Sequence, residues 1–181
     1  MIKEIIFNEI HFKNYGKNEI DKLFDHNGLI VLPSGPGLSC VNKDKIYLQA
    51  LRNSDQVLLD SGYFVLLLKF FKNISVNKLS GYLFFTHLVK HLQKKKFKKL
   101  LSIDPNNKLS KNNNNFFLKK GLNNNKIIHY IAPKYNTLKL FDLKLLRLIK
   151  ENKPDYIIIN IGGGVQEILG YYLKRKFNNK L

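Results

Sequence analysis

The sequence is short of cysteine and contains no tryptophan. Its one cysteine, Cys40, excludes a disulfide framework and a cysteine-rich zinc site, and it favours a reducing cytoplasm. The longest apolar run, residues 63–68, ends at Lys69 and is too short to span a bilayer. The first residues, Met1-Ile2-Lys3-Glu4-Ile5-Ile6-Phe7, predict a short strand, and they lack the apolar core and the cleavage site of a signal peptide.

Acidic residues are scarce as well. The chain has 13 Asp and Glu against 31 Lys and Arg, a formal net charge of +18. Three explanations are open: binding to nucleic acid, attraction to an anionic membrane surface, and a compositional bias towards Lys, Asn and Ile. The densest basic run, residues 94–99, has no Arg and only one aromatic residue, whereas a platform that stacks bases needs both. We therefore favour the bias, rank the membrane surface second, and rank nucleic acid last.

The order of apolar and polar segments predicts alternating strands and helices. At 181 residues the chain is long enough for one domain with its own core, and the connections between its expected elements are short, so we expect no domain boundary. Strands separated by helices favour an α/β fold: a single, Rossmann-like domain with a doubly wound, mostly parallel sheet and helices on both faces. The expected strands are 28–32, 56–60, 77–79, 100–103, 126–132 and 155–161. The expected helices are 42–53, 61–71, 80–94, a short one ending near 121 after a polar loop over 106–115, one starting at 136–137, and a last one after 164.

A glycine-rich corner near the end of the chain is the first candidate site. The apolar run of residues 156–161 leads into Gly162-Gly163-Gly164, and Gln166 and Glu167 then open a helix. Glycines let a backbone approach a ligand closely, and a helix N-terminus directs free N–H groups at an anion. In an open α/β sheet a phosphate-bearing ligand binds at such a corner. The alternative is a plain strand-to-helix connection without a ligand.

A second corner surrounds Asp60, where a predicted strand ends and Ser61-Gly62 opens an apolar helix. A carboxylate at the carboxyl edge of a sheet can act as a general base on a sugar hydroxyl, or bind a ribose or a metal. It can equally cap the following helix. We expect Asp60 to lie at the same crevice as the glycine turn.

Taken together, the two corners resemble the WecG/TagA/CpsF family of bacterial glycosyltransferases. The family's Pro-Asp-Gly corner corresponds to Leu59-Asp60-Ser61-Gly62, and its Gly-x-Asp helix start corresponds to Lys78-Leu79-Ser80-Gly81. Its Gly-x-Pro-Lys-Gln-Glu corner corresponds to residues 162–167, preceded by Pro154-Asp155. The similarity runs from about residue 28 to about residue 174.

The resemblance implies a metal-independent, inverting enzyme without a cofactor. Such an enzyme moves N-acetylmannosamine, or a related N-acetylhexosamine, from a UDP donor to a polyprenyl-diphosphate-linked acceptor in cell-envelope polysaccharide synthesis. It would be cytoplasmic and peripheral at the inner face of the plasma membrane. Carried over by position, Asp60 is the catalytic base. The implied substrate-binding residues are Ser34, Gly35, Ser61, Gly62, Gly81, Gly162, Gly163, Gly164, Gln166 and Glu167.

The chain also departs from the family pattern. Leu32 and Ser34 occupy the places of the Thr and Asn of a Thr-x-Asn turn, and Leu83 occupies the place of the Asp in Gly-x-Asp. Gly164 and Val165 replace Pro-Lys. These changes indicate a divergent branch with an altered donor sugar. The family's C-terminal appendage, with its basic membrane-contacting tail, is absent from the sequence, so a fragment, a chain that needs a partner and an inactive member are alternatives.

Three further side chains are weaker candidates for a site. Tyr135 follows the strand predicted over 126–132 and could stack on a uracil or simply pack in its loop. His87 and His91 share one face of a predicted helix, but a catalytic zinc usually has three protein ligands, so we expect no metal site there. The sequence leaves open whether the chain forms a homo-oligomer.

Overall fold

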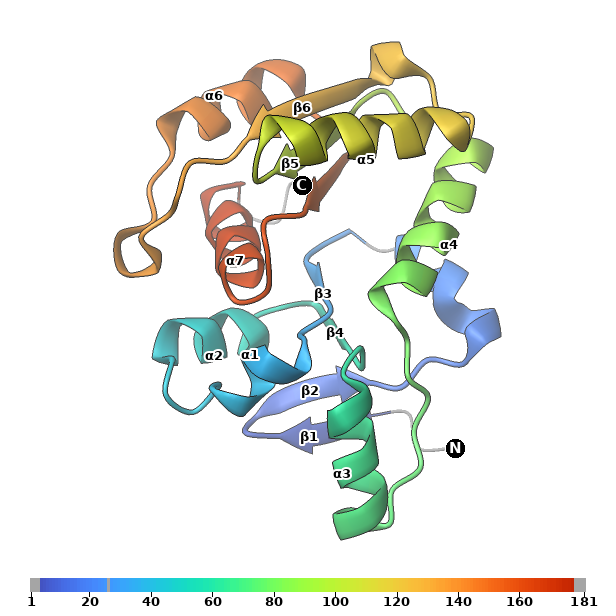
Figure 1. Cartoon of the computed structure of the whole chain (residues 1–181), viewed down its shortest axis with the longest axis vertical. Helices are drawn as coiled ribbons and strands as arrows, with labels where there is room; N and C mark the ends of the chain where they lie inside the picture. Colours follow the sequence, from blue (N-terminus) through green and yellow to red (C-terminus); the bar gives the residue numbers. More distant parts are fainter. Residues whose placement is uncertain (1–3, 26, 178–181) are drawn as a thin grey trace. The chain divides into compact units, whose positions relative to one another are not determined.

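The computed structural model describes residues 4–25 and 27–177. Contacts within the chain divide it into two compact units, Met1–Leu88 and Val89–Leu181, which are described separately here. The predicted α/β class is confirmed: each unit combines helices with parallel strands, consistent with a Rossmann-like, doubly wound fold (Figure 1). The strands of the described residues are divided between two sheets.

The first unit contains the four-stranded sheet, in the order β1-β2-β4-β3. β1 and β2 pair antiparallel, whereas β4 pairs parallel with both β2 and β3. Helix α3 packs on this sheet through Phe64, whose ring lies 5.3 Å from that of Phe7 and 5.2 Å from that of Phe12. The elements are β1 (Glu4–Phe7), β2 (Ile10–Lys13), the 3-10 helix η1 (Lys17–Asp25), β3 (Ile30–Val31), α1 (Gly35–Ser39), α2 (Lys45–Arg52), β4 (Gln56–Leu58), α3 (Gly62–Lys72) and α4 (Gly81–Lys94).

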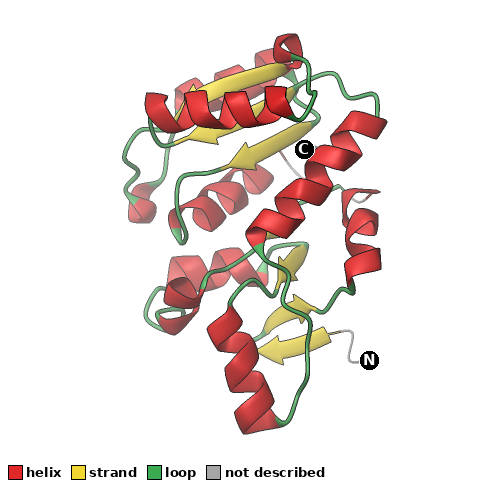
Figure 2. Ribbon diagram, turned by 45° about the vertical axis from the view of Figure 1, so that its right-hand side comes forward, coloured by secondary structure: helices red, strands yellow, loops and turns green. Residues whose placement is uncertain are grey.

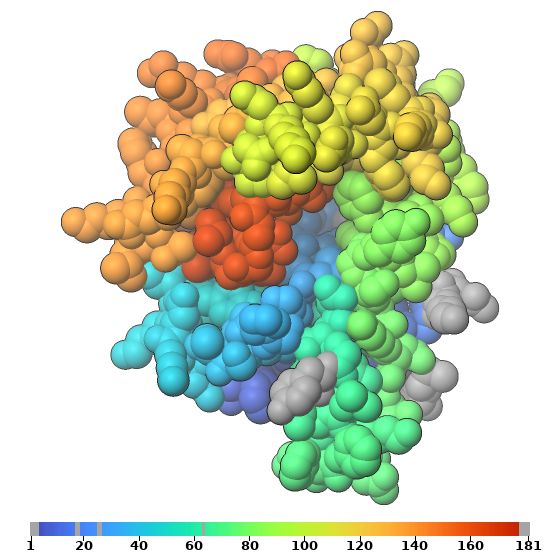
Figure 3. Space-filling model, viewed as in Figure 1, coloured from blue at the N-terminus to red at the C-terminus, as the bar shows by residue number. Residues whose placement is uncertain are grey.

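Within this unit, α3 reaches beyond the strands on which it packs. Its N-terminal part lies beside β1 and β2, and its C-terminal part extends past them (Figure 1). The space-filling view shows that this end of the helix, in green, stands out at the surface (Figure 3). The boundary between the two units falls inside α4, between Leu88 and Val89.

The second unit is built on three parallel strands in the order β6-β5-β7. Side chains of a strand alternate between the two faces of a sheet, so each face of the central strand β5 carries a different set. Helices lie on both sides of the sheet (Figure 2). The elements are β5 (Leu100–Asp104), α5 (Asn107–Lys119), η2 (Asn124–Lys126), β6 (Ile127–Ile131), η3 (Thr137–Lys139), α6 (Leu143–Asn152), β7 (Tyr156–Ile159) and α7 (Val165–Phe177).

The two faces of β5 have opposite character. Leu101 and Ile103 pack into an apolar core with residues of α6 and α7: Leu145, Ile149, Leu169 and Leu173. Ser102 and Asp104 are also buried, but they point to the other face, where Asn113 of α5 donates a hydrogen bond to Asp104. A polar pair is therefore enclosed beside the carboxyl end of the central strand.

Three local predictions were wrong. The segment expected to be a polar loop over 106–115 is mostly helix α5, because the Asn106 side chain accepts a hydrogen bond from Leu109 N at 2.9 Å and caps it. The helix expected from residue 136 begins only at Leu143, where Asp142 is the cap. Residues 77–79 form no strand.

Candidate functional site

The Asp60 corner lies at the carboxyl end of β4, in the first unit. Asp60 is partly buried, and its Oδ1 accepts a hydrogen bond from the backbone N–H of Gly81 at 3.1 Å. Gly81 is the first residue of α4. The structure thus brings together two of the predicted site residues, which are 21 positions apart in the chain.

The cap of α3 is made by Ser61, the residue after Asp60. Ser61 is buried, and its Oγ accepts a hydrogen bond from Phe64 N at 3.1 Å. The alternative in which Asp60 caps its own helix is therefore wrong. Because the hydroxyl of Ser61 satisfies the helix, the carboxylate of Asp60 is directed to the start of the next helix instead.

Two glycines, Gly35 and Gly62, allow neighbouring side chains to approach the backbone at this corner. A side-chain carbon built on Gly35 would lie 3.0 Å from the Oγ of Ser61, so the start of α1 is packed against Ser61. A carbon built on Gly62 would lie 3.3 Å from the Nζ of Lys78. Ser34 precedes α1 with extended backbone, and its hydroxyl makes no capping hydrogen bond.

Lys78 is a candidate functional residue that the sequence reasoning did not single out. Its ammonium group lies over the first turn of α3, directly after Asp60 and Ser61. A cation there adds positive charge to a corner that already presents the N-terminus of α3. The sequence did offer a signal for this residue, because Lys78 lies three residues before Gly81, inside the segment matched to a family motif.

The glycine turn lies in the second unit, between β7 and α7. Gly162 and Gly164 have φ angles of +103° and +87°, in the region that residues with a side chain rarely adopt. A side-chain carbon built on either would meet no described atom of this unit within 4 Å, so the outer surface of the turn is open. The first turn of α7 is closed by a hydrogen bond from Gln166 N to Gly162 O at 3.1 Å.

Glu167 faces inward from this turn rather than outward. Its carboxylate is buried and accepts hydrogen bonds from Gly164 N at 2.6 Å and from the Nε2 of Gln166 at 3.2 Å. Burial raises the pKa of the Glu167 carboxyl group, although these hydrogen bonds act in the opposite direction. Glu167 therefore holds the turn together, and the substrate contact predicted for it stays a prediction, as do those of Gln166 and the glycines.

A buried network at the carboxyl end of β5 was missed. Asp104 is fully buried, and its Oδ1 accepts hydrogen bonds from Ser102 Oγ at 2.9 Å and from Asn113 Nδ2 at 2.6 Å. Its Oδ2 lies 2.9 Å from His129 Nδ1, and Asn160 Nδ2 lies 3.4 Å from Oδ1. Burial raises the pKa of Asp104, but these hydrogen bonds outweigh it and hold the pKa below its ordinary value.

This network connects the central strand to the glycine turn. His129 belongs to β6, and Asn160 follows β7 and precedes Gly162 by two residues. The carboxylate of Asp104 thus contacts groups from the other two strands of the sheet. The sequence signal was the alternation of polar Ser102 and Asp104 with apolar neighbours in a short strand.

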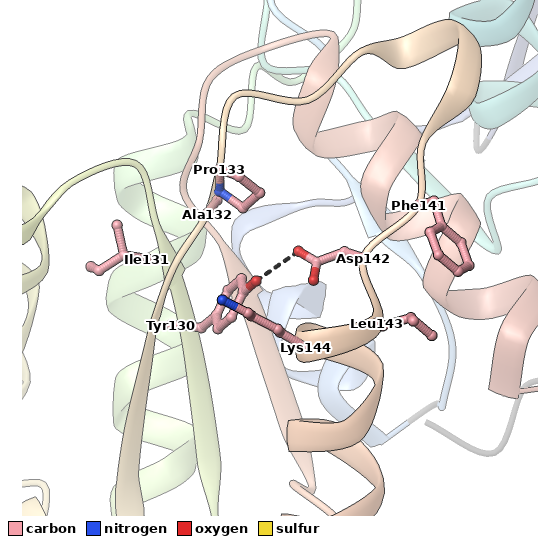
Figure 4. A pocket seen from close by; sticks show the side chains of 8 residues that line it. All are labelled: Tyr130, Ile131, Ala132, Pro133, Phe141, Asp142, Leu143 and Lys144. Atoms are coloured by element: carbon pink, nitrogen blue, oxygen red, sulfur yellow. Dashed lines mark hydrogen bonds between the residues drawn. The ribbon is translucent and has the colours of Figure 1, made fainter.

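A third group of side chains surrounds Asp142, the cap of α6. Asp142 Oδ2 accepts hydrogen bonds from the hydroxyl groups of Tyr130 and Tyr135, both at 2.7 Å, and Oδ1 accepts one from Leu145 N at 2.9 Å. Burial and the neighbouring carboxylate raise the pKa of both tyrosines. Tyr130 and Asp142 border a hollow, which is lined by Tyr130, Ile131, Ala132, Pro133, Phe141, Asp142, Leu143 and Lys144 (Figure 4).

Tyr135 is consequently held by its hydroxyl group. Its ring is half-buried in the apolar core of the second unit, and its hydroxyl group is bound to Asp142. This arrangement is that of a packed loop tyrosine, one of the two alternatives. Stacking on a uracil stays a prediction.

The histidines of α4 have separate partners. His87 Nδ1 lies 2.9 Å from Asp21 Oδ1, and His91 Nε2 lies 3.2 Å from the hydroxyl group of Tyr156. In residues 4–25 and 27–177, no three His, Cys, Asp or Glu side chains gather as a metal would require. Across the same part of the chain, every helix is too short or too polar to cross a bilayer.

Comparison with known proteins identifies the chain at the level of the family. No curated protein gives a significant match. The model of the glycosyl transferase WecG/TagA/CpsF family matches residues 4–181, which is nearly the whole chain. Members of this family are transferases that act in polysaccharide biosynthesis. The chain therefore belongs to the glycosyl transferase WecG/TagA/CpsF family and is a glycosyltransferase.

Proposed function

We propose that the chain is a metal-independent, inverting glycosyltransferase with a UDP-sugar donor and a polyprenyl-diphosphate-linked acceptor. The sugar is of the N-acetylhexosamine type, N-acetylmannosamine or a relative of it. The family supports a sugar-nucleotide donor and a lipid-linked acceptor in general terms. The departures at Leu32, Ser34 and Leu83 favour a donor sugar that differs from that of typical members.

The main support for this function is the position of Asp60. Ser61 caps α3, so the Asp60 carboxylate does not serve as that cap, and it lies at the carboxyl end of a parallel strand. Parallel α/β sheets bind their substrates at this edge. The hydrogen bond from Gly81 N occupies Oδ1 and leaves Oδ2 to accept a proton from a substrate hydroxyl.

In the proposed reaction Asp60 takes the proton of the acceptor hydroxyl as that oxygen attacks the anomeric carbon. The bond between the anomeric carbon and the β-phosphate oxygen breaks, and UDP leaves with the electron pair. One general base is sufficient for this inversion. The product is the glycosylated lipid diphosphate.

The leaving diphosphate needs compensating charge. We assign this to the glycine turn of residues 162–164, where the N-terminus of α7 offers backbone N–H groups, with Gln166 beside it. Lys78 adds a cation at the Asp60 corner. Backbone dipoles and a lysine can stabilise developing negative charge without a metal ion.

A lipid-linked acceptor places the reaction at a membrane. We therefore propose that the chain works at the inner face of the plasma membrane, as a peripheral protein. The net charge of +18 supports attraction to anionic lipid.

The test compares Asp60→Asn with Asp21→Asn, a control at an exposed carboxylate of the same unit. Transfer is measured from UDP-N-acetylhexosamines to a lipid-diphosphate acceptor, and UDP binding is measured by calorimetry. We expect Asp60→Asn to lose on the order of a hundredfold or more in transfer, as removal of a general base does, with UDP affinity unchanged. Normal transfer by Asp60→Asn would refute its role as the base. UDP binding by the wild type without transfer to any acceptor would instead favour the inactive-member alternative.

A further inference from the structure

Helix α3 is apolar on two opposite faces. Phe64 is buried against Phe7 and Phe12 of the sheet of the first unit, and Leu68, one turn later on the same face, is buried as well. Leu66 and Phe70 lie four residues apart on the face turned away from them, because each residue advances an α-helix by about 100°. These two side chains are 52% and 78% exposed. A helix on the surface of a globular protein normally turns polar side chains outward, so this face is suited to an apolar environment.

The exposed apolar surface continues at the end of the helix. Phe71 is 79% exposed, and the exposed lysines Lys69 and Lys72 stand beside it in the last turn. This is the part of α3 that extends past β1 and β2 (Figures 1 and 3). Aromatic rings next to lysines suit the boundary of a bilayer, where the rings enter the acyl region and the ammonium groups reach lipid phosphates.

The part of the sequence that contains α3 is basic. Between Asp60 and Leu88, where the first unit ends, it has no acidic residue and three lysines, Lys69, Lys72 and Lys78. This complements an anionic lipid surface, which attracts each nearby lysine. A symmetric contact between two copies would bring the same patch of each together and oppose Lys69 and Lys72 to their own counterparts. Charge therefore favours lipid over a second copy as the partner of this face.

We infer that the outward face of α3 docks the chain on an anionic lipid bilayer through Leu66, Phe70 and Phe71, with Lys69 and Lys72 on lipid phosphates. The assignment rests on the proposed function only in expecting a membrane-embedded acceptor. α3 starts at Gly62, next to Asp60, and its 11 residues span about 16 Å. Docking through its C-terminal turns therefore keeps Asp60 within about one helix length of the lipid surface.

The test is co-sedimentation of the full chain with vesicles. Vesicles of phosphatidylethanolamine with phosphatidylglycerol are compared with vesicles of phosphatidylcholine alone. The double variants are Phe70→Ser with Phe71→Ser, and Lys69→Glu with Lys72→Glu. The matched controls are Leu138→Ser, at a side chain that is also 78% exposed, and Lys108→Glu with Lys111→Glu, which reverses two exposed lysines on α5.

We expect the wild type to bind anionic vesicles and not neutral ones. Each α3 double variant should bind about tenfold or more weakly, because it removes buried apolar area or lipid-facing charge, whereas the controls bind nearly as the wild type does. The melting temperatures should stay unchanged, since all four side chains are exposed. Equal binding by the α3 variants and their controls would overturn the assignment. So would a change in sedimentation velocity showing that Phe70→Ser with Phe71→Ser dissociates a dimer.

The outcome can be separated from that of the proposed function. Asp60→Asn should bind vesicles as the wild type does, because it leaves the outward face of α3 intact. Loss of transfer in Asp60→Asn together with normal vesicle binding by the α3 variants would sustain the reaction and refute the docking surface. Normal transfer by Asp60→Asn together with weakened vesicle binding by the α3 variants would refute the reaction alone.

Discussion

Removing the carboxylate of Asp104 should destabilise the second unit more than any comparable change at its surface. Asp104→Ala leaves donors of Ser102, Asn113 and His129 without their acceptor in a fully buried place. Each buried hydrogen-bonding group that is left unsatisfied costs about 1–3 kcal/mol, so three donors without an acceptor should cost at least about 3 kcal/mol. Each kcal/mol lowers the melting temperature of a chain of this size by about 2–4 °C, so we expect a fall of at least about 6 °C, measured by thermal unfolding at pH 7.

Asp104→Asn is a milder test of the same network. It keeps one acceptor oxygen but turns an N–H towards a donor, which should cost about 1–3 kcal/mol. The control is Asp21→Asn, whose ion pair with His87 is exposed on the carboxylate side and should contribute less than about 1 kcal/mol.

The pH dependence has a definite sign. The folded pKa of Asp104 lies below its ordinary value of 3.8, so the stability it contributes is fully present above that value and is lost as the pH falls through the folded pKa. The wild type should therefore lose stability below about pH 4 more steeply than Asp104→Asn does. Two results would contradict this argument. One is a melting temperature of Asp104→Ala within about 2 °C of that of the wild type. The other is an equal loss of stability below about pH 4 in the wild type and in Asp104→Asn.

Two further predictions concern the glycine turn. Gly164→Ala should weaken UDP binding about tenfold or more, because its φ of +87° disfavours a side chain and the new methyl group would lie on the open face of the turn. The control is Gly121→Ala, after α5, where a φ of +77° imposes similar strain. Calorimetry should show that this control binds UDP as the wild type does. Glu167→Gln should gain stability relative to the wild type as the pH rises from 4 to 7, because burial raises the pKa of Glu167 and a group with a raised folded pKa loses its contribution as the pH rises through that value. A difference in melting temperature that is the same at both pH values would contradict this second prediction.

The sequence predicted the parts of the fold that depend on local pattern. The apolar runs before Asp60 and Gly162 became strands β4 and β7, and the helices after them begin within a few residues of the predicted positions. The N-terminal part of helix α5 was predicted as a loop because its asparagines disfavour a helix by propensity alone. The cap at Asn106 and the burial of Phe117 outweighed that propensity.

The candidate site was predictable only in part, for a related reason. Asp60 and the glycine turn could be recognised in the sequence, because each lies in a short run of characteristic residue types. The partners of Asp104 come from other elements: His129 lies 25 residues away and Asn160 lies 56 residues away. The tyrosines that bind Asp142, 12 and 7 residues before it, reach its carboxylate only because the chain after β6 folds back. Such contacts arise from tertiary packing, which periodicity along one chain does not encode.

The neighbouring residues Asp60 and Ser61 divide two duties that a single side chain often combines. The hydroxyl of Ser61 satisfies the start of α3, whereas the Asp60 carboxylate contacts Gly81. Selection can therefore adjust each position without disturbing the other. A substitution at position 60 would therefore leave the start of α3 anchored by Ser61.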